Sequence, residues 1–237
     1  MDSQPETAPA GLDHPAALAR LRLLQLCSPA LPVGAYAYSQ GLEYAVERGW
    51  VSDEASAGDW ILGLLGHSLR RLDVPVFARL HRAWHSGDTS ALQHWNAWLY
   101  ASREAGELQR EDQQLGRALA RLLTDLGIAE AQRWCNSRQV CFATLFSLAT
   151  VRWGIALPEA ASGYAWTWLE NQVAAATRLI PLGQTASQRL LIAAGPVLVD
   201  VLNQGLTLAD EEIGAAAPGL ALAGALHETQ YSRLFRS

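Results

Sequence analysis

The chain has 237 residues, half of them hydrophobic and only 17% charged, which is enough to bury the core of one large domain. Its net charge of −5 offers no basic face for phosphates, so DNA and RNA are excluded as main partners. All 18 basic residues are arginine. Because the lysine of a GK[ST] phosphate loop is missing, nucleotide binding by that loop is excluded, and so is Schiff-base catalysis.

The N-terminal residues 1–13 are polar and contain prolines, so we expect a flexible segment, and they lack the apolar stretch of a signal peptide. The three cysteines, Cys27, Cys135 and Cys141, form neither a CxxC pair nor an even set, which is typical of reduced thiols in the cytoplasm. The apolar stretches are too short to span a bilayer. We therefore predict a cytoplasmic protein with no membrane partner.

Helical spacing and capping residues predict a succession of helices in the first half of the chain. The first begins near Asp13 and Pro15 and runs to residue 27, where a rigid loop at 28–34 with two prolines and a glycine ends it. Short loops, several of them with glycine, separate the helices that follow. Those helices are expected over residues 36–47, 52–72, 74–85, 89–103 and 108–126.

The second half continues in the same way. A buried helix is expected over 137–153 and a longer one over 159–179. Thr185-x-x-Gln188 fits a capping box and predicts a helix to residue 202, and Thr207-x-x-Asp210 opens a short one. No series of strand-like runs alternates with turns. The sequence therefore predicts an all-α fold, a single-domain bundle of about nine or ten helices over residues 14–226, followed by a tail over 227–237.

One pair of histidines raises the question of a metal site. His81 and His85 are spaced i, i+4 on a predicted helix, which can present two imidazoles to one ion. Arg82 stands where a zinc protease would have its catalytic glutamate, and no third ligand is evident nearby. A solvated helix face is the favoured interpretation, with a nickel or other metal site as the minor alternative.

Acidic side chains and arginines mingle at the start of the helix predicted over 108–126. Two neighbouring carboxylates can do acid–base work. The favoured alternative is an exposed face laced with i, i+3 and i, i+4 ion pairs. If these residues do act, partner recognition is a better interpretation than catalysis. The residues concerned are Glu104, Glu107, Glu111 and Asp112, with Arg103, Arg110 and Arg117.

Two segments are not explained by helix packing alone. In residues 28–43 a proline-clamped loop is followed by Tyr36, Tyr38 and Gln40 at a predicted helix start, where backbone N–H groups are free. In residues 170–191 amide and arginine side chains interrupt an apolar helix–break–helix. Uncharged amides beside apolar residues suit a partly buried protein interface. We expect both segments to contact other proteins.

Five stretches of the chain together resemble the UreF family of urease accessory proteins. The combination of SPALPVG…YSQGLE with PLGQTxxQ is specific, and the matching stretches span nearly the whole chain after residue 15. Arg178 departs from the lysine that many members have, and Leu115 departs from methionine; arginine keeps the charge but is planar and forked. The stretches are SPALPVGAYAYSQGLEYAVERGWV (28–51), ELQREDQQLGRALARLL (107–123), FATLFSLATVRWGI (142–155), WTWLENQVAAATRLIPLGQTASQRLL (166–191) and HETQYSRLFRS (227–237).

The resemblance implies an all-α homodimer that takes part in the maturation of urease, in which nickel is delivered to the apoenzyme. The partners it implies are the accessory protein UreD, called UreH in some organisms, the GTPase UreG, and apo-urease. The implied role is that of a non-enzymatic adaptor that bridges UreD and UreG and regulates GTP-dependent nickel delivery. The alternative is a GTPase-activating regulator of UreG that supplies an arginine finger, with Arg178 or an arginine of the tail as candidate.

The resemblance assigns partner binding to residues of the two segments and of the tail, and the tail is the part expected to engage UreD. No catalytic, cofactor-binding or metal-binding residue is expected, and no cofactor. The expected partner-binding residues are Gly34, Tyr38, Ser39, Gln40, Glu43, Glu107, Arg178, Gln184, Gln188, Arg189, Tyr231, Arg233, Leu234, Phe235 and Arg236.

Overall fold

The computed structural model describes residues 13–214 and 217–237, and within these ranges the chain consists of helices and loops without strands. The predicted all-α single-domain bundle is confirmed. The flexible segment predicted over residues 1–13 lies outside the described residues, apart from Asp13. In chain order the elements are α1 (His14–Cys27), the short 3-10 helix η1 (Ala35–Ala37), α2 (Leu42–Glu47), α3 (Glu54–Leu64), η2 (Leu65–Asp73), α4 (Val74–Ser86), α5 (Thr89–Ala101), α6 (Gly106–Asp125), η3 (Ala129–Trp134), α7 (Phe142–Arg152), α8 (Leu157–Leu179), α9 (Gln184–Gly205), η4 (Asp210–Glu212) and α10 (Pro218–His227).

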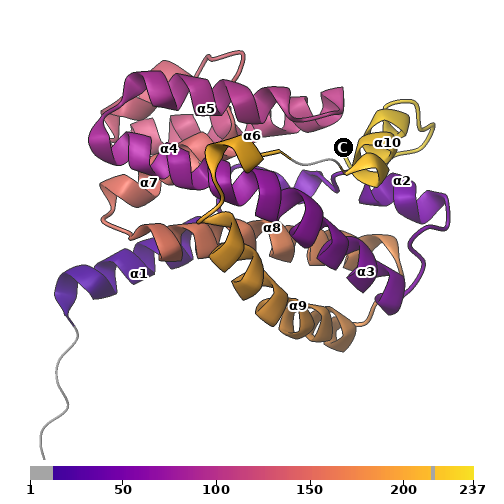
Figure 1. Ribbon diagram of the computed structural model, residues 1–237. Helices are drawn as coiled ribbons and strands as arrows, with labels where there is room; N and C mark the ends of the chain where they lie inside the picture. The colour runs from indigo at the N-terminus through magenta and orange to yellow at the C-terminus, as the bar shows by residue number, and fades with distance from the viewer. Residues whose placement is uncertain (1–12, 215–216) are drawn as a thin grey trace, which may run out of the picture.

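The main core lies where α4, α5, α6, α7 and α8 meet (Figure 1). Phe77 of α4 stacks on Tyr164 of α8 with ring centroids 4.9 Å apart, and it meets the edge of Phe146 of α7 at 6.1 Å. Both phenylalanines are fully buried. Figure 1 shows α2 and α10 at the opposite end of the molecule, with the C-terminus between them and the bundle. Aromatic packing holds the helices of the main core together, and the tail lies toward the end with α2 and α10.

The helix predicted over residues 52–72 is confirmed, but it is wound in two ways. The carboxylate of Asp53 accepts a hydrogen bond from the backbone N–H of Ser56 at 2.9 Å, and the Ser56 hydroxyl accepts one from the N–H of Asp53 at 3.1 Å. This capping box fixes the start of α3. From Leu65 to Asp73 the chain forms a π-helix, η2, that continues directly into α4. Asp73, at its end, is 4% exposed and lies inside the bundle.

The continuous helix predicted over residues 36–47 is wrong. The backbone has positive φ at Gln40 (54°) and Gly41 (77°), which separates η1 from α2. A Cβ atom on Gly41 would lie 3.0 Å from the Cβ of Ala223 in α10, so α10 packs directly against this turn. Glycine permits both the left-handed backbone and the close approach. The turn is decided by a contact with residues far along the chain, which the local periodicity cannot reveal.

The helix predicted over residues 137–153 begins later, at Phe142. The backbone N–H of Cys141 donates to the side chain of Asn96 at 3.0 Å, and that of Phe142 donates to Asp112 at 2.6 Å. These two side chains supply partners for N–H groups at the start of α7, which would otherwise have none. The preceding residues run as a loop, held by α5 and α6.

Further boundaries also differ from the prediction. α9 begins with Gly183 as its N-cap and no side-chain cap, so the predicted capping box of Thr185 with Gln188 is not formed. The short helix predicted from Thr207 is a 3-10 turn, η4. α10 has no counterpart among the predicted helices; Pro218 opens it, as proline does in a first turn, rather than breaking it.

α9 combines an apolar composition with an open position at the surface. By length and composition alone it could cross a membrane, and it is the one helix in the described part of the chain that could. In this fold it packs along α8 and η2. Only 33% of its apolar window is buried, and Ile192 and Val199 are 76% and 56% exposed. α9 therefore presents an uncovered apolar face.

Candidate functional site

The C-terminal tail, residues 227–237, folds back onto the loop between η1 and α2. The backbone N–H of Arg236 donates to the carbonyl of Ala37 at 2.8 Å. The backbone N–H and the hydroxyl of Ser39 both donate to the carbonyl of Ser237, at 2.8 Å and 2.6 Å. The first of the two predicted interface segments and the tail are thus one structural unit, although almost two hundred residues separate them in the chain.

Glu43, in the first turn of α2, holds the backbone of the tail. One carboxylate oxygen accepts from the N–H of Leu234 at 2.6 Å, and the other accepts from the N–H of Phe235 at 2.9 Å. The second oxygen also lies 3.0 Å from Nε2 of His227. Glu43 is 7% exposed. A buried carboxylate with this many donors is a strong fastening for an irregular segment.

Glu107, in the first turn of α6, holds the tail from the other side. Oε2 lies 2.6 Å from Nδ1 of His227, and Oε1 accepts from Nη1 of Arg233 at 2.8 Å. His227 is 0% exposed and Glu107 is 4% exposed. The imidazole therefore bridges α2 and α6 at the point where the tail leaves α10. We call Glu43, Glu107, Glu111, His227 and Arg233 the tail cluster.

Glu111, one turn further along α6, completes the cluster. It accepts from Nε2 of Gln40 and from the hydroxyl of Ser237, both at 2.7 Å. Burial raises the pKa of Glu111 to about 7, against which the hydrogen bonds of Gln40 and Ser237 act. The amide oxygen of Gln40 in turn accepts from Nε1 of Trp168 on α8 at 2.7 Å. Gln40 is thus fixed in orientation between α6 and α8.

The second predicted interface segment also contacts the first. Asn171 and Gln172 of α8 donate to the carbonyls of Tyr38 and Ser39, at 3.0 Å and 3.3 Å. Arg178 donates from Nη1 to the carbonyl of Tyr36 at 3.1 Å, and its guanidinium lies 4.7 Å from the centroid of the Phe235 ring.

Such a cation–π contact fastens the tail a second time. The amides and Arg178 therefore organise the chain itself, in addition to any partner they meet.

Not all of the predicted residues come together. Gln184, Gln188 and Arg189 are exposed at the start of α9, and in the described ranges they make no hydrogen bond to the tail. Arg189 instead forms a bidentate ion pair with Glu54 of α3, at 2.5 Å and 2.8 Å. Gly34, with φ of 82°, precedes η1, and its carbonyl accepts a hydrogen bond from the backbone N–H of Ala37 at 3.1 Å.

The acidic residues at the start of α6 were expected on an exposed, ion-paired face, and that expectation is wrong for three of the four. Glu107, Glu111 and Asp112 are 4%, 3% and 6% exposed, while Glu104 is exposed. The acidic face of α6 is turned inward because the tail and the start of α7 supply donors for it. Two donors from Arg103 reach Asp73 at 2.7 Å and Asp112 at 3.0 Å.

This inner network borders a cavity of ≈ 80 Å³ whose lining is mostly apolar. Asp73, Arg103, Glu111 and Asp112 line it together with Gln40. No motif in the sequence indicated a role for Asp73 or His227. The one local indication that either side chain is buried is its place beside apolar residues, and the tertiary contacts are needed to interpret it.

The sequence model of the UreF family matches residues 51–195. The chain is 54% identical over 220 residues to the urease accessory protein UreF of Alkalilimnicola ehrlichii, covering 93% of this chain and 96% of the relative. This chain belongs to the UreF family. The resemblance carried by the sequence motifs is confirmed.

Other relatives agree with this membership. The chain is 51% identical to the urease accessory protein UreF of Chromohalobacter salexigens over 231 residues, 98% of this chain and 99% of that relative. It is 45% identical to urease accessory protein UreF 2 of Brucella anthropi over 224 residues, 94% and 99% of the two chains. The likeness to the UreF relatives therefore extends over nearly the full length of the chain.

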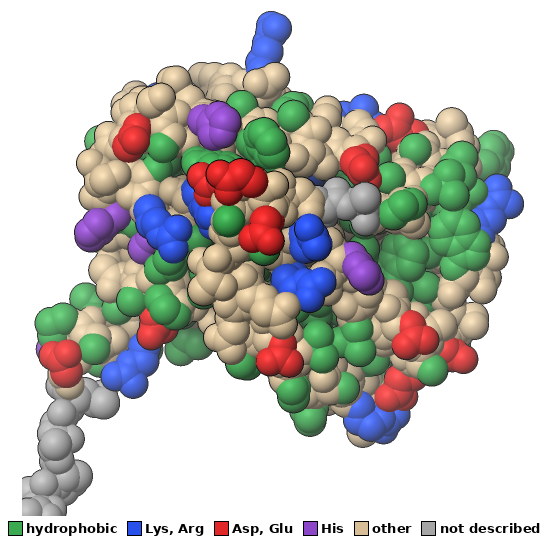
Figure 2. Space-filling view, viewed as in Figure 1, with side chains coloured by type: hydrophobic (Ala, Val, Ile, Leu, Met, Phe, Trp, Pro, Cys, Tyr) green, Lys and Arg blue, Asp and Glu red, His purple; other side chains and the backbone are tan. Residues whose placement is uncertain are grey.

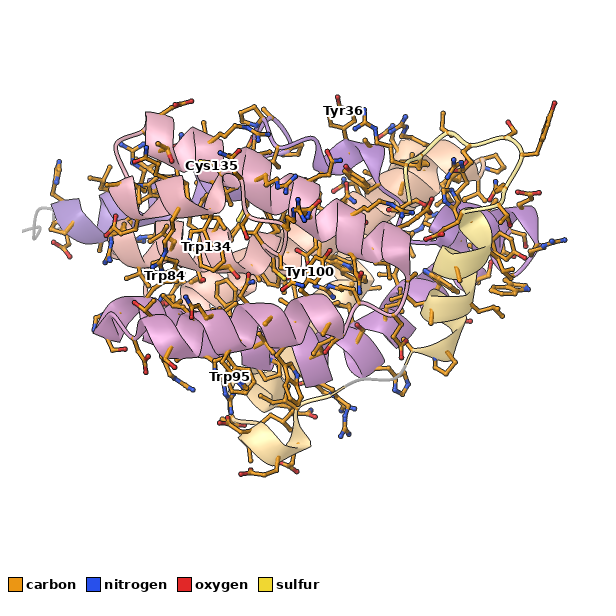
Figure 3. All side chains as sticks on the ribbon, turned by 90° about the horizontal axis from the view of Figure 1, so that it is seen from above. Tyr36, Trp84, Trp95, Tyr100, Trp134 and Cys135 are labelled. Atoms are coloured by element: carbon orange, nitrogen blue, oxygen red, sulfur yellow. The ribbon has the colours of Figure 1, made fainter. Side chains whose placement is uncertain are left out.

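The outer side of the tail is open in this UreF-family chain. Tyr231 and Leu234 are 106% and 57% exposed, although the backbone beneath Leu234 is fixed by Glu43. Tyr36 is 71% exposed, and Figure 3 shows it at the rim of the molecule, pointing away from the helices. Figure 2 shows hydrophobic side chains gathered at the end where α2 and α10 lie. We call Tyr36, Tyr231, Leu234 and the exposed Arg236 the outer tail face.

The histidine pair of α4 does not converge. His81 is 8% exposed, and its Nε2 lies 3.2 Å from the carbonyl of Ile155, while His85 is exposed. Burial lowers the pKa of His81, which keeps the ring neutral. Within the described residues no group of three or more His, Cys, Asp and Glu side chains is arranged to hold a metal ion.

Proposed function

We propose that this UreF-family chain is a non-enzymatic adaptor in the maturation of urease by nickel insertion. It would bridge UreD (UreH) and the GTPase UreG on apo-urease and regulate GTP-dependent nickel delivery. The observation that carries the proposal is the outer tail face, in which exposed aromatic and apolar side chains stand on a rigidly fastened backbone. A surface that is ordered before binding loses less conformational entropy when a partner covers it.

The partner that we assign to the outer tail face is UreD. Tyrosine and arginine are the residue types that contribute most to protein interfaces, and an isolated Leu234 side chain suits a small apolar pocket. Residues Gln184, Gln188 and Arg189 lie apart from the tail, at the start of α9. We propose them as a separate contact, for UreG or apo-urease.

A pull-down tests the assignment of UreD. Leu234→Asp should abolish the capture of UreD, since a charge on the outer face cannot be desolvated in an apolar pocket. The matched control is Leu126→Asp, which changes a similarly exposed leucine (50%) that directly follows α6. Equal recovery of UreD by Leu234→Asp and by the unchanged chain would contradict the assignment. Truncation after Leu226 is less sharp, because it also removes His227 from between two buried carboxylates.

We also propose a homodimer formed through the apolar face of α9 and its neighbours. α1 and α9 both pack against α8. Leu21 and Leu24 of α1 are 63% and 67% exposed, Trp166 of α8 is 36% exposed, and Ile192 of α9 is 76% exposed. An apolar surface of this kind is usually covered by another polypeptide, and a second copy of the chain is the simplest occupant.

The dimer proposal predicts the outcome of a sedimentation experiment. Ile192→Asp should shift the chain from dimer to monomer at micromolar concentration, whereas Leu126→Asp should leave the dimer intact. A monomeric unchanged chain, or a dimeric Ile192→Asp variant, would contradict the assignment of this face.

The alternative function remains a GTPase-activating regulator with an arginine finger. Arg178 is held by the Tyr36 carbonyl and the Phe235 ring, so a finger role would require it to leave both. A single-turnover GTPase assay of UreG with Arg178→Ala decides this alternative, which fails if stimulation is absent or unchanged. We place the assembly in the cytoplasm, which the three free thiols support, and propose neither nucleic acid nor membrane as a partner.

A further inference from the structure

His227 is fully buried in the tail cluster, where its neighbours are carboxylates and an arginine. Both ring nitrogens face carboxylate oxygens: Nδ1 lies 2.6 Å from Glu107 and Nε2 lies 3.0 Å from Glu43. Each distance is that of a hydrogen bond. A proton is therefore needed on each side of the ring, unless one of the carboxylates carries it.

The other contacts of the two carboxylates decide where the protons are. Glu43 accepts from two backbone N–H groups, of Leu234 and Phe235, and Glu107 accepts from the guanidinium of Arg233. These donors favour the ionised form of both carboxylates. A neutral imidazole has one N–H group, so its other nitrogen would point a lone pair at a carboxylate. Only the doubly protonated imidazolium donates to both.

We propose that His227 is a buried imidazolium and acts as a positioning residue, whose second proton locks the C-terminal tail onto α2 and α6. Loss of that proton sets a lone pair against a carboxylate and releases the residues that follow. The lock then opens as the pH rises. Tyr231 and Leu234 are presented in fixed positions only while it is closed.

The charged groups around His227 support the same assignment of its protons. Arg233 remains on Glu107 when the ring is neutral, but Glu43 then has no cationic partner in the tail cluster. Glu111 and Asp112 lie further along α6, and Arg103 pairs with Asp112. At the rim, Glu228 pairs with Arg110 and accepts from the backbone N–H of Glu107. Deprotonation thus leaves an uncompensated buried carboxylate, which is unfavourable.

Nitrogen NMR of the full-length chain, labelled at histidine, reads the protonation state directly. At neutral pH both ring nitrogens of His227 should show the shifts of an imidazolium. A single protonated nitrogen on His227 at neutral pH overturns the proposal.

Hydrogen exchange of the Leu234 and Phe235 amides measures whether the tail is held on α2 and α6. After correction for the intrinsic rate, their protection should fall at least about tenfold between about pH 6 and about pH 10 in the unchanged chain. The same fall is expected in His85→Gln, the matched histidine control. In Glu107→Gln an amide N–H can donate to the neutral ring while the amide oxygen keeps Arg233, so protection should stay high and depend less on pH.

Two results contradict the lock. One is protection of Leu234 and Phe235 that does not change with pH in the unchanged chain, and the other is a Glu107→Gln variant with the same pH dependence as that chain. His227→Leu should lose protection at every pH, and Glu107→Gln keeps the test valid if that variant misfolds. The proposal rests on the proposed function only for the use of the tail by a partner. Failure of the lock would leave the pull-down with Leu234→Asp unaffected, and failure of the pull-down would leave the exchange result unaffected.

Discussion

The aromatic core around Phe77 and the tail cluster around His227 are equally buried, and they are stabilised by opposite kinds of interaction. The ring of Phe77 stacks on Tyr164 and meets the edge of Phe146. Glu43 and Glu107 instead hold the tail through hydrogen bonds and charge. Apolar packing does not depend on pH, whereas buried ionisable groups do. The contrast separates a permanent scaffold from a segment whose attachment can be changed, although Tyr164 of the first and Glu111 of the second border the same cavity.

The largest expected effect is on the scaffold. Phe77→Ala should lower the free energy of unfolding by about 4–5 kcal/mol, because it removes buried surface and leaves a cavity among three rings. Urea denaturation at two pH values measures this loss, which should be the same at both. Leu126→Ala, at an exposed position, should change stability by no more than about 0.5 kcal/mol. If the loss of unfolding free energy in Phe77→Ala depended strongly on pH, the aromatic core and the tail cluster would not differ in the way described.

A smaller effect is expected where the two regions meet. Arg103→Ala leaves Asp73 and Asp112 without their cation in the interior and should lower the free energy of unfolding by about 3–4 kcal/mol. The control is Arg152→Ala, which removes an ion pair with Glu130 whose side chains are 38% and 41% exposed. That change should amount to less than about 1 kcal/mol. Comparable losses in the two variants would show that burial does not set the strength of these pairs.

The smallest effect is the pH dependence contributed by Glu111. Its pKa is raised by burial from 4.5 to about 7, so the folded chain keeps a proton that the unfolded chain has already lost. This contribution to stability is complete below pH 4.5 and is lost as the pH rises to about 7, by at most about 3 kcal/mol. Denaturation from about pH 4.5 to about pH 8 should show a shallower decline in Glu111→Gln. An unchanged slope would remove Glu111 from the pH-sensitive region.

Most helices could be predicted from local signals, and the failures have one cause. Asp53 with Ser56 fixes the start of α3 within a few residues, which periodicity and capping rules detect. The turn at Gln40 and Gly41 exists because α10 packs against it from far along the chain. The carboxylate of Glu107 is buried because His227, 120 residues away, bonds to it. Neither contact leaves a local pattern in the sequence.

The motifs predicted a set of partner-binding residues but not how these residues are arranged. The motifs place Glu43, Gln40 and residues of the tail in that set, whose partner binding stays a prediction. They did not show that Glu43 faces inward, that Leu234 faces outward, or that Gln188 and Arg189 lie on a different element. A motif specifies residue types and their spacing along the chain, whereas the side that each residue faces depends on how the helices pack.

The sequence by itself determined the helical class, the UreF resemblance, and the exclusion of a lysine-dependent nucleotide loop. These follow from composition, short-range periodicity and motif spacing, which are properties of neighbouring residues. Only the tertiary structure decided that the acidic face of α6 is buried, that the tail returns to α2, and that His227 lies between two carboxylates. Those features depend on contacts between residues far apart in the chain, such as Glu43 and His227, which are 184 positions apart, and such contacts exist only after the chain has folded.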